Sequence, residues 1–96
     1  MPGYLGWAEL LDEYGRVLDH AQVELWSGPA GTDDGWSGDL LPIGKRRFAA
    51  ALNLRPGARL NLRLPNGRAA ICEVERRRQG EPELVRIGGR GPAPFG

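Results

Sequence analysis

The sequence has few of the residues on which the commonest catalytic and cross-linking chemistries depend. One cysteine, Cys72, and one histidine, His20, stand among 96 residues. A single cysteine excludes an internal disulfide and is typical of a protein of the reducing cytoplasm. No cysteine or histidine follows another at the spacing of a zinc site, so we expect no metal and no cofactor.

Long apolar segments are also missing. No stretch approaches the roughly 18 consecutive apolar residues that a membrane-spanning helix needs. The first residues, Met1-Pro2-Gly3-Tyr4, lack the basic segment and apolar run of a signal peptide. We therefore expect a cytoplasmic protein without a membrane partner.

Glycine and proline, by contrast, are abundant, with 15 and 8 residues. Together with short runs of alternating apolar and polar residues, they favour an all-β fold of short strands over a helical fold. A chain of this length can bury one modest core. We expect a single domain over residues 1–96.

The clearest pattern is a β-hairpin in residues 55–75. Leu60, Leu62 and Leu64 alternate with polar residues, as in a strand with one buried face. A turn segment, Pro65-Asn66-Gly67, follows, and a second alternating run comes after it. The hairpin is the part of the chain around which we expect the other strands to pack.

Two turns fit this hairpin. A two-residue type I′ turn would place Leu60 opposite Glu73, whereas a three-residue loop with Gly67 in the left-handed region places Leu60 opposite Cys72. The second register also pairs Leu62 with Ala70 and leaves Glu73 on the outer face opposite Arg59. Because burying an unpaired carboxylate costs several kcal/mol, we predict the three-residue loop and a buried Cys72.

Further alternating segments predict strands at residues 4–11, 16–26, 36–41 and 83–88. Residues 45–52 fit either a strand or a short helix, and we expect a strand there. Six or seven short antiparallel strands hide their edges most completely by closing into a small β-barrel, with a two-sheet β-sandwich as the alternative. Residues 89–96 predict an irregular tail from which Phe95 can dock on the barrel.

Charge is unevenly distributed along the chain. Residues 1–40 hold eight acidic residues and one arginine, a net charge of −7, while residues 41–96 hold twelve bases and four acids, a net charge of +8. One interpretation is that acidic and basic strands lie side by side in one barrel and neutralise each other. The other is a basic face for an anionic partner.

Four short motifs are spread over nearly the whole chain: Tyr4-x-Gly6-x-Ala8-Glu9-Leu10, Trp36-Ser37-Gly38, Leu62-Arg63-Leu64-Pro65-Asn66-Gly67-Arg68 and Gly89-x-Gly91-Pro92-x-Pro94-Phe95. With these motifs the chain resembles a group of short, uncharacterised β-barrel proteins common in actinobacteria. Ala93 stands where that group would have another proline. The resemblance implies a small barrel, and related domains resemble appendages of some flavin-dependent oxidoreductases. The group has no assigned chemistry, so the resemblance implies no catalytic residue.

The loop before the third predicted strand is the first candidate binding site. Trp36 could stack on a sugar or base while Asp33 and Asp34 accept hydrogen bonds. The same carboxylates could hold calcium, but the spacing of a calcium-binding loop is not matched. Alternatively, the segment is a turn-rich loop from which Trp36 returns to the core.

Two arginine clusters are the second candidate. The first, Lys45-Arg46-Arg47, and the second, Arg76-Arg77-Arg78, could follow a phosphate backbone as small nucleic-acid-binding barrels do. The outer face of the predicted hairpin has no aromatic residue for base stacking, which weakens this hypothesis. The alternative is a solvated basic face, or one that pairs with the acidic strands.

No pattern indicates catalysis. Serine, histidine and aspartate are present, but no nucleophile-elbow sequence holds a serine and no glycine-rich phosphate loop precedes a helix. The sequence favours a non-enzymatic protein over an enzyme and assigns no catalytic residue. The leading hypothesis is an interaction or accessory module that binds a protein partner or a second copy of itself. A nucleic-acid-binding barrel and a small-ligand or sugar-binding barrel are the alternatives.

Overall fold

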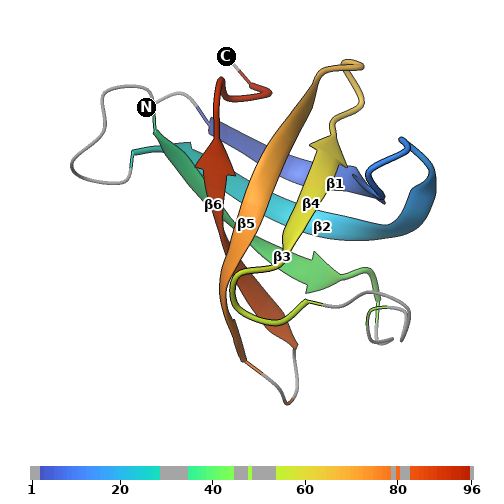
Figure 1. Cartoon of the computed structure of the whole chain (residues 1–96), viewed down its shortest axis with the longest axis vertical. Coiled ribbons are helices and arrows are strands. Elements are labelled where there is room, and N and C mark those ends of the chain that lie inside the picture. Colours follow the sequence, from blue (N-terminus) through green and yellow to red (C-terminus); the bar gives the residue numbers. More distant parts are fainter. Residues whose placement is uncertain are drawn as a thin grey trace.

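In the computed structural model, six antiparallel strands form a closed barrel with the strand order β1-β2-β3-β6-β5-β4 (Figure 1). The structure describes residues 3–28, 35–44, 48, 54–78, 80 and 83–95. The predicted all-β barrel is confirmed. Its strands are β1 (Gly3–Leu11), β2 (Val17–Ser27), β3 (Trp36–Pro42), β4 (Arg59–Arg63), β5 (Ala69–Arg78) and β6 (Leu84–Arg90).

The strand order divides the barrel into two three-stranded meanders. The acidic meander consists of β1, β2 and β3, and the basic meander consists of β4, β5 and β6. They meet along two seams, one between β3 and β6 and one between β1 and β4. The β1–β4 seam is short, because only Glu9, Leu10 and Leu11 pair with β4. The closure of the barrel therefore depends on a few residue pairs that are distant in the sequence.

The predicted register of the central hairpin is confirmed. Leu60 pairs with Cys72, and Arg59 pairs with Glu73 on the outer face. Gly67 has a φ of +85°, and among the described residues only glycines have positive φ, so the loop is the three-residue turn and not the type I′ turn. The turn is closed by the Gly67 amide, which donates to the Leu64 carbonyl over 2.9 Å.

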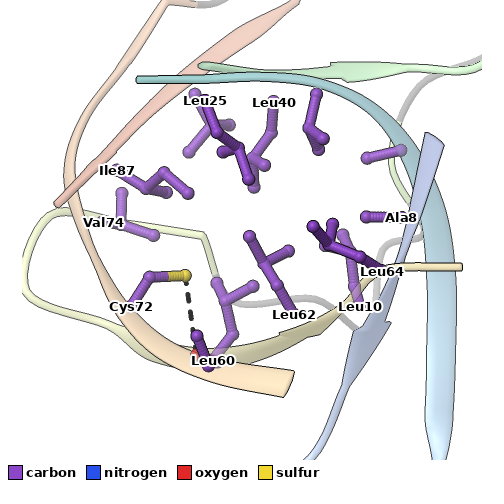
Figure 2. Packing of buried hydrophobic residues seen from close by; sticks show 14 of the residues in the cluster. Ala8, Leu10, Leu25, Leu40, Leu60, Leu62, Leu64, Cys72, Val74 and Ile87 are labelled. Atoms are coloured by element: carbon purple, nitrogen blue, oxygen red, sulfur yellow. Dashed lines mark hydrogen bonds between the residues drawn. The ribbon is translucent and has the colours of Figure 1, made fainter. Parts of the chain in front are cut away.

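The barrel interior is filled by the apolar face of every strand (Figure 2). Leu60, Leu62 and Leu64 are buried, as the alternation of the sequence predicted. Cys72 lies among them with its side chain fully buried, and its thiol donates to the Leu60 carbonyl over 3.6 Å. Cys72 is therefore a small core residue.

The other predicted strands agree with the structure except at the end of the chain. The first three lie within one residue of their predicted ends, whereas the last continues to Arg90, so the irregular tail begins at Gly91 and not at Gly89. Gly89 is needed inside β6 for packing, because a Cβ there would lie 2.0 Å from Cε2 of Trp36. Whether residues 45–52 form a strand or a helix lies outside the described residues, except that Phe48 is buried.

After β6 the chain makes a short hook at the end of the barrel where the β4–β5 turn also lies (Figure 1). The hairpin turn holds this tail, since the Asn66 side-chain amide donates to the Pro94 carbonyl over 3.2 Å and the Arg68 guanidinium donates to the Ala93 carbonyl over 2.9 Å. Phe95 packs edge-on against Trp36 with ring centroids 6.3 Å apart. The predicted docking of Phe95 is confirmed, and it closes the core at this end.

The packing of Trp36 on Gly89 can be tested by substitution. We expect Gly89→Ala to lower the free energy of unfolding by about 3 kcal/mol, because the rigid indole ring must move away from the new methyl group. Gly15→Ala is the control, since Gly15 has open space around it and a φ of +82°, so it should lose only about 1 kcal/mol of backbone strain. Urea unfolding followed by circular dichroism measures both, and equal losses would contradict the packing argument.

Candidate functional site

The predicted loop site is only partly described. Asp33 and Asp34 lie outside the described residues. Trp36 is fully buried between Gly89 and Phe95, so the faces of its ring are closed to a ligand from solvent. The structure places Trp36 in the core, which is the alternative that the sequence left open.

The structure describes one of the two predicted arginine clusters. Arg46 and Arg47 lie outside the described residues. Arg76 and Arg78 are exposed on β5, but Arg77 between them forms an ion pair with Glu83, donating from Nε over 2.8 Å. Arg77 is thus held by a carboxylate, whereas the side chains of Arg76 and Arg78 are exposed.

Glu83 is the most buried charged side chain among the described ion pairs. Its side chain is 1% exposed, and its second oxygen accepts the Phe48 backbone amide over 3.2 Å. The carboxylate thus joins β5 to the segment that carries Phe48. The ion pair with Glu83 therefore gives Arg77 a structural role.

The remaining arginines of the basic meander are also largely paired with carboxylates. Two of these pairs lie at the seams: Arg63 Nε donates to Glu9 over 2.6 Å between β4 and β1, and Arg86 pairs with Asp39 between β6 and β3. The hydrogen bond that the Arg86 guanidinium donates to Asp39 raises the pKa of Arg86. The sequence's first interpretation of the uneven charge, acidic and basic strands side by side, is confirmed at both seams.

The outer face of β1 carries an exposed apolar surface. The Leu5 side chain is 69% exposed and the Trp7 side chain is 49% exposed. His20 of β2 lies beside Trp7 with ring centroids 6.0 Å apart and contacts Glu9 over 3.9 Å. The sequence places Leu5 and Trp7 on the face opposite the buried Ala8 and Leu10, so this surface could have been found from the alternation alone.

The same part of β1 has an unpaired edge. β2 pairs with β1 along its whole length, but β4 reaches only as far as Glu9. In the described part of the chain, residues 3–8 therefore have a strand on one side only, and no backbone hydrogen bond joins them to another described segment. We call the outer face and free edge of residues 3–8 the β1 surface.

The direction of the free backbone groups follows from the hairpin. Leu64 donates its amide to Arg68 of the hairpin, so the odd-numbered residues of β4, including Arg63, face β1. Arg63 pairs with Glu9, and because backbone groups alternate along a strand, those of Leu5 and Trp7 point to the free edge. In agreement, the Trp7 carbonyl accepts a hydrogen bond from a side chain, the Tyr4 hydroxyl, over 2.8 Å.

A hollow of about 610 Å³ lies beside β4, and residues of β1, β2, β4, β5 and the turn after β1 line it. Its Asp12 carboxylate is occupied by the turn, accepting the Tyr14 and Arg16 amides over 2.9 and 2.8 Å. The hydrogen bond from the Arg16 amide is the main reason why the pKa of Asp12 is lowered. Asp12 is thus a turn residue and a poor general acid.

Reactive groups are scarce in the described part of the chain. Burial raises the pKa of the Cys72 thiol to about 12, so the thiolate that would act as a nucleophile is absent at neutral pH. Residues 3–28, 35–44 and the other described segments contain no group of three histidine, cysteine, aspartate or glutamate residues that could hold a metal ion.

A separate finding concerns membranes. Within the described segments, no helix has the length and apolar character required to cross a bilayer.

The buried ion pair generates a prediction on stability. We expect Glu83→Gln to lower the free energy of unfolding by about 3 kcal/mol, because it leaves the guanidinium of Arg77 without its carboxylate. Glu73→Gln is the matched control, since Glu73 pairs with Arg90 at a half-exposed position and should lose less than about 1 kcal/mol. Chemical denaturation measures the free energy of unfolding of both variants. Similar losses of stability would show that burial of Glu83 does not strengthen its ion pair.

The buried thiol generates a second prediction. At pH 8 only on the order of one Cys72 in ten thousand is a thiolate, given its raised pKa, and the side chain is enclosed. Cys72 of the native protein should therefore not react with a disulfide reagent such as DTNB, whereas Cys72 of the unfolded protein should react at once. Reaction of the native protein within minutes would place the thiol on an accessible surface instead.

Comparison of the chain with protein-family models, with curated proteins and with solved structures finds no match. The resemblance to actinobacterial barrel proteins remains a prediction from the sequence. Any function must therefore be argued from the surfaces described above.

Proposed function

We propose that this barrel is a non-catalytic interaction module that binds a protein partner through the β1 surface. The observation that supports this proposal best is that the exposed side chains of Leu5 and Trp7 lie beside a strand edge without a partner in the described structure. Single exposed apolar residues are common on protein surfaces. Two large ones at alternate positions beside an unpaired strand edge form a contiguous surface that a protein partner would bury.

The composition of the β1 surface fits a protein partner. Residues 3–8 contain no charged side chain, and tryptophan is among the residues that contribute most to protein interfaces. An extended segment of a partner can add to a free strand edge through backbone hydrogen bonds while its side chains contact Leu5 and Trp7. The β1 surface offers both kinds of contact at one place.

The alternative functions have weaker support. Arg63, Arg77 and Arg86 form ion pairs with carboxylates, which leaves them less available to a phosphate backbone. Trp36 is enclosed, so a sugar or base cannot stack on it in the described structure. The cytoplasmic location is a prediction from the sequence.

A photo-crosslinking experiment tests the proposed function. Benzoylphenylalanine replaces Leu5 in one full-length variant and, as the control, Tyr14 in another, because Tyr14 is 76% exposed and lies in the turn beyond β1. On irradiation in native cells, we expect position 5 to give a discrete protein adduct at several times the yield of position 14. Adding Trp7→Ala to the position 5 variant should remove most of that adduct.

The adduct is identified by mass spectrometry, which distinguishes another protein from a second copy of the chain. Equal yields from the two positions, or no adduct at position 5, would contradict the proposal.

A further inference from the structure

We propose that the β1 surface recognises a lysine or arginine side chain of its protein partner. Leu5 and Trp7 contact the aliphatic part of that side chain, and Glu24 of β2 binds its charge. The inference rests on the proposed function, because it names the chemistry of the partner at the same surface. Three observations support it: the position of Glu24, its lack of a partner among the described residues, and the apolar side chains beside it.

Glu24 lies directly beside the two exposed apolar residues. In the register of β1 with β2, Leu5 is opposite Glu24 and Trp7 is opposite Gln22. The backbone groups of Leu5 and Trp7 point away from β2, so both pairs are of the non-hydrogen-bonded kind, in which Cα atoms are about 4.5 Å apart and side chains are closest. Trp7 is the diagonal neighbour of Glu24, at a distance that long side chains span. The carboxylate and the apolar side chains thus form one continuous surface.

The Glu24 carboxylate has no compensating charge in the described part of the chain. Glu24 is exposed, and no hydrogen bond or ion pair joins its side chain to another described residue. Its neighbouring carboxylates differ in this respect. Asp39, opposite Glu24 on β3, pairs with Arg86, and Glu9 on β1 pairs with Arg63. Of these three carboxylates, Glu24 is therefore the one available to a cation from another molecule.

A lysine or arginine side chain matches both parts of this surface. Such side chains bury their methylene groups against apolar residues while the charged end reaches a polar group. The face of a tryptophan ring also attracts a cation. His20 is opposite Glu9 in the register, so it approaches Trp7 from that side and does not stand between Trp7 and Glu24.

Other partner chemistries fit the surface less well. A purely apolar segment that covered Leu5 would remove water from the adjacent Glu24 carboxylate without giving it a partner, which is costly. An acidic segment would place a like charge beside Glu24. A basic side chain is the one that gains both the apolar contact and the ion pair.

Binding measurements with the protein captured at position 5 test this inference. That protein is purified, and isothermal titration calorimetry measures its affinity for the full chain. We expect Glu24→Gln to weaken binding about tenfold, because the variant loses a hydrogen bond between charged groups. Glu13→Gln is the matched control, since Glu13 is also exposed and without a partner among the described residues, but lies in the turn after β1. It should bind as the wild type does.

Two further measurements distinguish a direct contact from an indirect effect on the fold. Raising the salt concentration should weaken the binding of the wild type more than that of Glu24→Gln, because salt screens the ion pair that the variant lacks. Mass spectrometry of the adduct identifies the contacting segment of the partner. Replacing its lysine or arginine with glutamate should weaken binding to the wild type, and Glu24→Lys should restore it by placing opposite charges together again.

Circular dichroism checks that each variant folds. Unchanged affinity of Glu24→Gln, an equal loss in Glu13→Gln, or a contacting segment without lysine or arginine would each overturn the inference. In these cases the adduct at position 5 leaves the proposed function standing. The absence of any protein adduct at position 5 would remove both proposals.

Discussion

The structure depends on the closure of two meanders along two seams. Neither meander can bury its apolar face alone, and the core forms only when β1 meets β4 and β3 meets β6. Among the described residues, each seam carries one ion pair, Glu9 with Arg63 and Asp39 with Arg86. Because these pairs are partly exposed, each contributes at most about 1 kcal/mol, and burial of the leucines supplies most of the stability. The main effect of the ion pairs is on strand pairing, because they favour contact between the acidic meander and the basic meander.

The turn that sets the core register also creates the β1 surface. β4 ends at Arg63 because the chain turns at Pro65, and β1 continues past that point without a neighbouring strand in the described part of the chain. The tail is held at this end of the barrel by Asn66 and Arg68 of the same turn, and among the described residues no backbone hydrogen bond joins it to residues 3–8. One short turn thus determines both what the barrel encloses and which strand it leaves open.

The register of the hairpin could be predicted from the sequence because the alternative register would have buried the Glu73 carboxylate. That energetic cost can be recognised from the residues of the hairpin alone. The role of Gly89 could not be predicted, because it depends on Trp36, a residue more than fifty positions away whose ring rests on the glycine. The same holds for Arg77, which belongs to a run of three arginines in the sequence but forms an ion pair with the buried Glu83. The alternation of β1 predicted that Leu5 and Trp7 share a face, but their unpaired edge depends on where β4 stops beside β1, which the sequence does not state. The local alternation of apolar and polar residues predicts the strands, whereas the candidate site depends on pairings between residues that are distant in the sequence.

The division into meanders also has a consequence for how the chain folds. Contacts within a meander join neighbouring strands through short connections, whereas the seam contacts join residues as far apart as Glu9 and Arg63. The entropy of closing such long loops must be overcome before either seam forms, so the meanders are expected to assemble first and the seams last. Their opposite net charges attract during that last step. It follows that dissolved salt, which screens this attraction, slows the late docking of the two halves more than the early formation of the strands.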